Sequence, residues 1–331
     1  MTAAAPSDRK PPVSRRGISP PTDRREATLE RHARAAGGFR SGTIALVGRP
    51  NVGKSTLINR LVGEKVAIVS DVPQTTRTRV IGVRRVPGAE LIFVDTPGLH
   101  KPRHLLNEAM VRAARAALDE ADVILFLVDV TAPLGPGDRA VLDLLRPRRA
   151  PVLLILNKVD RVEKPRVLPM IDESRSLFEF AEIFPISATR DDDFTDLLNA
   201  IVARLPEGEA AYPEDEYTDQ SLRALAAEWI REPILRHTRQ EVPHAVAVRI
   251  DEFIEDDEKG LVTIKATVVV EKASQKGILI GSGGAMMKRV GEESRIELER
   301  VTGRKVFLSL WVTVEEAWRQ SPRALRELGY T

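Results

Sequence analysis

The 331-residue sequence contains no cysteine, no long apolar run and almost no excess of charge of either sign. Without cysteine there is no disulfide, no thiolate metal site and no cysteine nucleophile, a composition that fits a reducing cytosol. The longest unbroken apolar run, residues 123–128, is far shorter than the ~20 residues that a membrane-spanning helix needs. Lysine and arginine total 50 against 48 acidic residues, so the net charge of +2 does not by itself indicate a polyanionic partner.

The remaining composition is that of a globular protein with two domains and a tail. Charged residues make up 30% and hydrophobic residues 43% of the chain, and at ~150 residues per domain the length predicts two domains. Residues 1–40 carry nine basic and four acidic residues and are rich in proline, so we interpret them as a disordered, solvated basic tail. Its longest apolar stretch, Ala3–Ala5, excludes a secretory signal, whereas an arginine-rich organellar targeting segment stays an alternative.

Residues 41–205 alternate short apolar runs with helical patterns. Runs at 43–47, 123–128, 152–156 and 183–186 have the length of strands, and helical patterns cover 54–61, 105–118 and 197–205. Residues 80–86 and 90–94 flank the turn dipeptide Pro87-Gly88 and predict an antiparallel hairpin. Continuous apolar strands are typical of strands covered on both faces, so this segment predicts an α/β domain with a mostly parallel sheet and helices on both faces.

A second unit follows a linker. Residues 206–219 contain two prolines, a glycine and six acidic residues, a composition typical of a linker. Residues 220–331 then predict an α+β domain in the order helix, strand, strand, helix, helix, strand. The strands are expected at 245–253, 261–270 and 305–312, with a loop at 277–284, a helix from Ala285 and a second helical stretch through Ile296 and Leu298.

The most informative segment is GRPNVGKS at residues 48–55, which matches G-x-x-x-x-G-K-[ST] between a predicted strand and a predicted helix. Glycines allow the backbone to wrap closely round phosphate groups with its N–H groups turned inward, and the following helix adds its positive end. Lys54 would reach the β and γ phosphates, and Ser55 would bind Mg2+ through its hydroxyl. The expected nucleotide-binding residues here are Gly48, Arg49, Pro50, Asn51, Val52, Gly53, Lys54, Ser55 and Thr56.

The choice of base depends on NKVD at residues 157–160, which follows the apolar run 152–156. A carboxylate at the base edge accepts two hydrogen bonds from guanine, whereas adenine would leave it unpaired at a high cost. Asp160 is therefore the expected guanine reader, with Lys158 over the base plane and Asn157 tying this loop to the phosphate loop. Ser187 and Ala188 are expected to complete the base pocket through their backbone.

Two further segments are expected to sense the γ phosphate. The sequence DTPG, Asp95-Thr96-Pro97-Gly98, ends a predicted strand, where Asp95 can hold Mg2+ through water and the Gly98 N–H can contact the γ phosphate. Residues 72–79 are polar and show no obvious core residue. Within them Thr76 is the candidate switch threonine that completes Mg2+ coordination, so the expected metal ligands are Ser55, Thr76 and Asp95.

The motifs GRPNVGKST, QTTR, DTPGLH, NKVD and ISA, in this order and spacing, resemble those of the GTPases related to Era and to the tRNA-modification GTPases. Residues 220–331 resemble the type II KH RNA-binding domain that characterises the Era-type GTPases. The resemblance implies a GTPase with GTP/GDP and Mg2+ as cofactors that binds 16S rRNA near its 3′ end and assists maturation of the 30S subunit. It further implies a cytoplasmic monomer. Peripheral association with the inner face of the membrane is a further possibility that the resemblance leaves open.

The RNA interpretation has a local basis in Gly281-Ser282-Gly283-Gly284, a G-x-x-G sequence. In KH domains such a loop lets a nucleic-acid backbone approach closely because no side chain stands in the way. No acidic residue occurs between Glu271 and Glu292. The expected RNA-binding residues are these four loop residues together with Lys272, Lys276, Lys288 and Arg289. Gly283 departs from the basic residue that relatives often carry in this loop, which predicts a weaker phosphate attraction from the loop itself.

The catalytic residues expected for GTP hydrolysis are Lys54, Thr76, Gly98 and Asn51. Leu99 stands where Ras-like enzymes place a water-orienting glutamine, so intrinsic hydrolysis should be slow. Asn51 resembles the asparagine that helps potassium-dependent relatives to bind K+ near the transferred phosphoryl group.

Two other functions stay open from the sequence. One is an RNA-binding protein with a vestigial nucleotide site, against which the intact Lys54, Ser55, Asp95 and Asp160 speak. The other is the GTPase component of an RNA-modification system, which would need a modification domain or a partner-binding insertion. Because all nucleotide motifs precede Gly208, a fragment that ends there is expected to bind GTP on its own.

Overall fold

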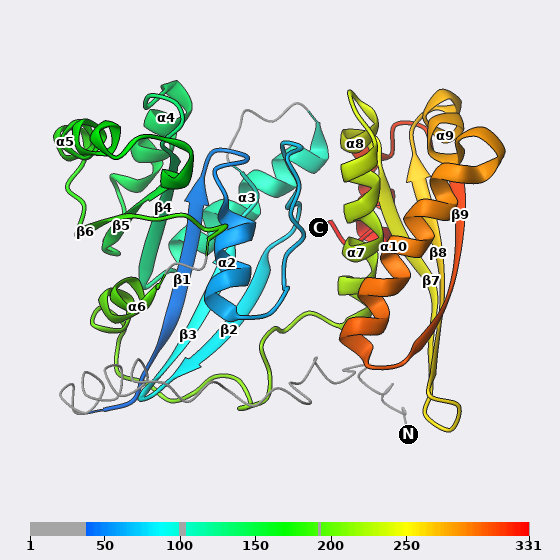
Figure 1. Cartoon of the computed structure of the whole chain (residues 1–331), viewed down its shortest axis with the longest axis horizontal. Helices are drawn as coiled ribbons and strands as arrows, with labels where there is room; N and C mark the ends of the chain where they lie inside the picture. Colours follow the sequence, from blue (N-terminus) through cyan, green and yellow to red (C-terminus); the bar gives the residue numbers. More distant parts are fainter. Residues whose placement is uncertain (1–37, 99–103, 191–192, 331) are drawn as a thin grey trace, which may run out of the picture.

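The computed structural model describes residues 38–98, 104–190 and 193–330. Two α/β units lie side by side, one built around strands β1–β6 and the other around β7–β9 (Figure 1). A chain segment at residues 203–221 joins them along the lower edge of the view.

The first unit is a six-stranded sheet in the order β2-β3-β1-β4-β5-β6. All neighbouring pairs are parallel except β2 with β3, which form the antiparallel hairpin that the Pro87-Gly88 turn predicts. The strands are β1 (Arg40–Gly48), β2 (Val80–Val86), β3 (Ala89–Asp95), β4 (Val123–Asp129), β5 (Val152–Asn157) and β6 (Glu182–Pro185). Because β1, β4 and β5 are central, their side chains are buried on both faces, which explains their continuous apolar sequences.

Helices cover both faces of this sheet. One apolar cluster joins the sheet to α2 (Lys54–Val62) and α6 (Thr195–Val202). A second cluster joins the opposite face to α3 (Leu105–Asp119), α4 (Pro136–Leu145) and α5 (Val167–Leu177). In a parallel sheet the loops that follow the strands gather at one edge, so the loops after β1, β3, β4, β5 and β6 meet there. This edge holds every expected nucleotide-binding segment.

The second unit is a three-stranded sheet in the order β7-β8-β9, antiparallel between β7 and β8 and parallel between β8 and β9. Its strands are β7 (Ala247–Asp256), β8 (Leu261–Val270) and β9 (Lys305–Val314). Its helices are α7 (Leu222–His237), α8 (Val242–Ala245), α9 (Ala273–Ile280), α10 (Ala285–Thr302) and α11 (Pro322–Glu327). Helices α7, α9 and α10 contribute to the same apolar cluster as the inward side chains of the three strands.

The structure corrects two details of the sequence-based prediction for this unit. The helix from Ala285 does not break before Ile296; it continues as α10 to Thr302, where Gly303 with φ 65° ends it. The other helix of the pair is α9, which precedes the Gly281–Gly284 loop instead of following it. The order of helices and strands is otherwise as predicted, with the short α8 and α11 added.

The segment 206–219 contains no helix or strand, but it is fastened to the first sheet. The Thr218 hydroxyl donates to the Ile81 carbonyl at 2.7 Å, and the Val83 N–H donates to the Tyr217 carbonyl at 2.8 Å. Farther back, the Ala211 N–H donates to the buried Glu90 carboxylate. The segment is therefore hydrogen-bonded to the β2–β3 hairpin and is not a free linker.

Candidate nucleotide and RNA sites

The phosphate loop connects β1 to α2, and its glycines are required by close contacts. Gly53 has φ 103°, and a Cβ there would lie 2.2 Å from the Asn157 side-chain nitrogen. Gly48 has φ 155°, and a Cβ there would lie 2.5 Å from the Leu127 carbonyl oxygen. Helix α2 begins at Lys54 with no side-chain cap, so its first N–H groups face the loop and form the kind of anion site found at helix N-termini.

Lys54 is buried at the base of this loop. Its Nζ donates to the carbonyls of Gly48 at 3.2 Å and Arg49 at 3.0 Å. Burial lowers the pKa of Lys54, and the nearby Asp95 carboxylate opposes that shift. The ammonium group is therefore held where phosphate oxygens on the loop would neutralise it.

Three oxygen-bearing side chains converge beside the loop. The Ser55 hydroxyl donates to Asp95 Oδ2 at 2.7 Å, the Thr76 hydroxyl lies 3.1 Å from the same oxygen, and the two hydroxyls are 3.0 Å apart. Asp95 is completely buried, and its other oxygen, Oδ1, has no hydrogen-bond partner among the described residues. Burial raises the pKa of Asp95. A buried carboxylate with an unused oxygen next to two hydroxyls is a hard-oxygen donor set that suits Mg2+.

The loop after β5 holds the expected base-binding residues. Asn157 Nδ2 donates to the Val52 carbonyl at 2.7 Å, and its Oδ1 accepts from the Ala188 N–H at 2.9 Å. One buried side chain thus ties the phosphate loop to both base loops. Asp160 is half-buried, and the hydrogen bond from the Ser187 hydroxyl, at 2.6 Å, lowers the pKa of its carboxyl. The carboxylate is therefore ionised and partly open to solvent.

Lys158 lies between the phosphate loop and a residue that the sequence did not single out. Its Nζ donates to the Asn51 carbonyl at 2.8 Å and pairs with Asp129 at 2.6 Å. Asp129 ends β4 and faces Asn157 across the β4–β5 register, so only strand pairing brings it to the site. These two contacts fix the position of the Lys158 ammonium group beside the phosphate loop.

The remaining expected residues line the same edge. The Thr96 hydroxyl donates to the Leu46 carbonyl at 2.8 Å, and Gly98 lies against Pro50, where a Cβ would come within 3.0 Å. Asn51 has φ 64°, and its Nδ2 donates to the Asp71 carbonyl at 2.5 Å. Leu99 lies outside the described residues.

In the second unit, the Gly281–Gly284 loop separates α9 from α10. Gly281, Gly283 and Gly284 have φ values of 70°, 58° and 81°, and nothing lies within 4 Å of a Cβ built on Gly283 or Gly284. Lys272, Lys288 and Arg289 are exposed on the flanking helices, and Lys276 is half-buried. Arg289 pairs with Glu293 at 3.2 Å, which places an acidic group beside this basic surface. The loop therefore offers an open backbone flanked by positive charge.

Two family sequence patterns match this chain. The pattern described as "50S ribosome-binding GTPase" matches residues 43–158, and the pattern described as "KH domain" matches residues 241–319. GTPase Era of Geobacter metallireducens is 48% identical over 293 residues, which cover 88% of this chain and 98% of that protein. GTPase Era of Heliobacterium modesticaldum is 46% identical over 292 residues, covering 88% and 97%.

This chain belongs to the Era family of GTPases.

Solved Era structures agree with this assignment. Era in complex with MgGDPNP and nucleotides 1506–1542 of 16S ribosomal RNA is 43% identical, with a TM-score of 0.86 over 88% of this chain and 99% of that one. A variant of Aquifex aeolicus Era bound to GDP.AlF4- gives the same identity and TM-score over 88% and 100%. The resemblance read from the sequence is confirmed, and so is the fold class of a P-loop GTPase domain followed by a type II KH domain.

Within this Era-family GTPase the structure brings together the expected nucleotide residues from four loops, and it keeps the expected RNA residues around one loop of the KH domain. It also shows what the sequence reasoning missed. Residues 72–79 were expected to lack core residues, yet Thr75, Thr76 and Arg77 are all buried. In the described ranges 38–98, 104–190 and 193–330, no helix is both long and apolar enough to cross a membrane.

Proposed function

We propose that this Era-family GTPase binds GTP and GDP with Mg2+ at the edge of the first sheet. The observation that carries this proposal is the convergence of Ser55, Thr76 and Asp95 beside the phosphate loop. Ser55 and Thr76 would bind the metal directly, and Asp95 through water. Lys54 and the loop N–H groups would hold the phosphates, and Asp160 would read guanine with Asn157, Lys158, Ser187 and Ala188 shaping the pocket.

In the proposed reaction, water attacks the γ phosphate while Lys54 and the Gly98 N–H stabilise charge on its oxygens. Mg2+, when bound, neutralises charge on the β and γ phosphate oxygens. Asn51 would help to bind K+ beside the transferred phosphoryl group through its side-chain Oδ1, because its Nδ2 donates to the Asp71 carbonyl at 2.5 Å. No glutamine follows Gly98, so the intrinsic rate should be slow.

We further propose that the KH domain binds 16S rRNA near its 3′ end and that the chain assists maturation of the 30S subunit in the cytoplasm. The solved Era relative that contains 16S rRNA nucleotides supports this, as do the open loop and the exposed Lys272, Lys288 and Arg289. A monomeric state and a peripheral association with the inner face of the membrane belong to the same proposal, on family resemblance alone.

The RNA proposal is tested by filter binding of a 16S rRNA 3′ fragment against tRNA. Replacing Ser282 and Gly283 by aspartate puts two charges where phosphates should pass, so affinity should fall steeply and the salt slope should drop by about one unit for each lost phosphate contact. The matched control is the pair Ser176→Asp and Gly260→Asp. Ser176 is exposed like Ser282, and Gly260 has φ 59° and open space like Gly283.

The control pair should bind the fragment like the wild type, and intrinsic GTPase activity should survive in both double variants. Equal affinity of wild type and the Ser282/Gly283 variant would show that the loop is a structural turn. Equal affinity for the rRNA fragment and tRNA would instead favour a GTPase of an RNA-modification system. A titration in which the chain binds no guanine nucleotide would favour the vestigial-site alternative.

A further inference from the structure

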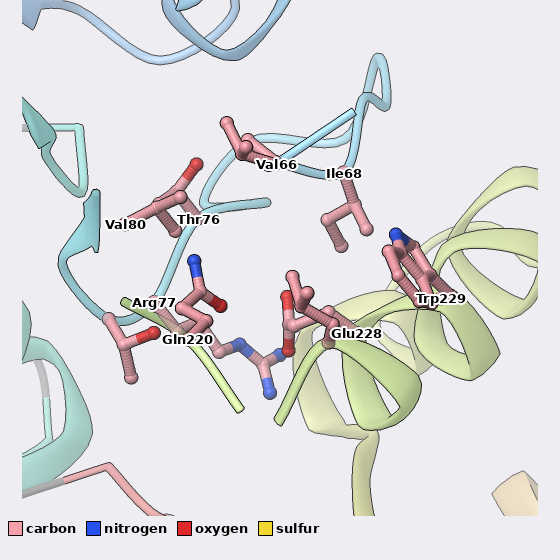
Figure 2. Close-up of a pocket in the computed structure, with 11 residues that line it drawn as sticks. Val66, Ile68, Thr76, Arg77, Val80, Gln220, Glu228 and Trp229 are labelled. Atoms are coloured by element: carbon pink, nitrogen blue, oxygen red, sulfur yellow. The ribbon is translucent and has the colours of Figure 1, made fainter. Parts of the chain in front are cut away.

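The segment that carries the expected switch threonine is enclosed between the two domains. A cavity of about 10 Å³ lies between Thr76 and Arg77 on one side and Glu228 and Trp229 of α7 on the other (Figure 2). Thr75, Thr76 and Arg77 are no more than 9% exposed. Three consecutive polar residues are buried only where their polar groups have partners, and most of these partners belong to the KH domain.

Arg77 reaches into the KH domain. Its guanidinium donates to the carbonyls of Val246 at 2.6 Å, His244 at 3.1 Å and Pro243 at 3.2 Å. These carbonyls lie at the C-terminal end of α8, where a helix has no internal donors for them. The planar fork of an arginine can satisfy several carbonyls at once, and a lysine ammonium cannot reproduce that geometry.

Two aromatic rings lie close to the same guanidinium. Its carbon lies 5.7 Å from the Trp318 ring centroid and 5.6 Å from the Tyr330 ring centroid. The two rings stack on each other at 5.9 Å, and the Trp318 Nε1–H donates to the Ala245 carbonyl at 2.8 Å. Both rings belong to an apolar cluster that includes Leu106 and Met110 of α3 in the GTPase domain. Arg77 is therefore fixed in place by both domains.

Thr75, on the other side of Thr76, is bound by a second arginine, and this one belongs to the KH domain. Arg231 of α7 is completely buried, donates to the Thr75 carbonyl, and is itself held by the Glu228 carboxylate at 2.6 Å and 3.0 Å. Earlier in the same segment, the Val69 N–H donates to Glu232 at 2.9 Å, and Lys65 pairs with Glu232 at 2.5 Å. The KH domain thus contacts the segment from Lys65 to Arg77 at four residues, which are Lys65, Val69, Thr75 and Arg77.

Thr76 is the residue between the two arginine anchors, and its hydroxyl points away from them toward Ser55 and Asp95. With both neighbours fixed, the backbone of Thr76 has little freedom left. We infer that Arg77, with Arg231, is a positioning residue of the KH domain interface that holds Thr76 in place to complete the Mg2+ site. This inference rests on the proposed Mg2+ role of Thr76.

The test measures binding of Mg2+·GDPNP and of GDP to the full chain carrying Arg77→Lys. Switch contacts to Mg2+ are made only when a γ phosphate is present. Loss of the arginine fork should therefore raise the Kd for Mg2+·GDPNP about tenfold or more and leave the Kd for GDP within about twofold. Arg231→Lys should produce the same selective loss. The matched control is Arg79→Lys two residues farther along, since Arg79 is exposed and forms a surface ion pair with Glu120.

A double-mutant cycle with Thr76→Ala separates positioning from general stability. If Arg77 acts through Thr76, adding Arg77→Lys to Thr76→Ala should change the Kd for Mg2+·GDPNP by less than about twofold. Unchanged Mg2+·GDPNP binding in both arginine variants would overturn the inference, and so would equal losses for GDP and Mg2+·GDPNP or full additivity in the cycle. Wild-type affinity in Thr76→Ala alone would refute the Mg2+ assignment itself, and the inference with it.

Discussion

Replacing Asn157 by alanine removes the buried side chain that bonds the phosphate loop to both base loops. The change leaves the Val52 carbonyl and the Ala188 N–H, both in buried residues, without their present partners. An unsatisfied buried polar group costs about 1–3 kcal/mol, so the free energy of unfolding of the GTPase domain should fall by about 2–5 kcal/mol. The base loops also lose their register with the phosphate loop, so the GDP affinity should fall by about tenfold or more.

Urea unfolding followed by far-UV circular dichroism measures the first effect, and titration with a fluorescent GDP measures the second. Tryptophan fluorescence would report the wrong domain, since all three tryptophans lie after Gln220. Asn199→Ala is the control, because the buried Asn199 side-chain oxygen has no hydrogen-bond partner among the described residues and its removal should cost little. A stability within about 0.5 kcal/mol of wild type together with unchanged GDP binding would refute the reasoning, because that is the range of neutral substitutions.

Three further predictions concern the nucleotide site. Asp160→Asn should weaken GTP and GDP binding and admit xanthine nucleotides, since an amide NH2 can meet the xanthine carbonyl; an unchanged base preference in competition would contradict this. A fragment that ends at Gly208 should still bind GTP but lose part of its preference for GTP over GDP, since it lacks Arg231; a folded fragment that binds no nucleotide would disprove the boundary. Hydrolysis should be faster in KCl than in NaCl, and equal rates would remove the role of Asn51 in binding K+.

The local motifs were readable because their chemistry is local. Gly48 to Ser55 specify a loop by spacing alone, and the apolar runs before Gly48 and Asn157 place both motifs at strand ends. Asp129 was not readable in this way, since only the pairing of β4 with β5 puts it opposite Asn157. The division of the Ala285 helix before Ile296 was wrong, because α10 continues without a break to Thr302.

The switch segment, residues 72–79, shows most clearly which features local sequence predicts and which depend on distant residues. Its sequence is polar and indicated no core residue, because a run of threonine and arginine has no apolar face of its own. Thr75, Thr76 and Arg77 are nevertheless buried in the structure. Arg77 donates to carbonyls about 170 residues away in the chain, and the Thr75 carbonyl accepts from Arg231. A buried charge is tolerated only where such partners exist. Because these partners are distant along the chain, the local spacing of residues does not predict them.

By itself the sequence determined the strand–loop–helix order, the phosphate loop, the guanine motif and the glycine loop of the KH domain. In each of these the needed groups lie within a few residues, so backbone conformation and spacing suffice. Only the tertiary structure decided that the two domains share the switch segment and that Thr76 is anchored on both sides. The packing of α7 and α8 in one cluster with the first sheet, and of the C-terminal aromatic residues with α3, created those partners. Packing is a property of the folded chain as a whole.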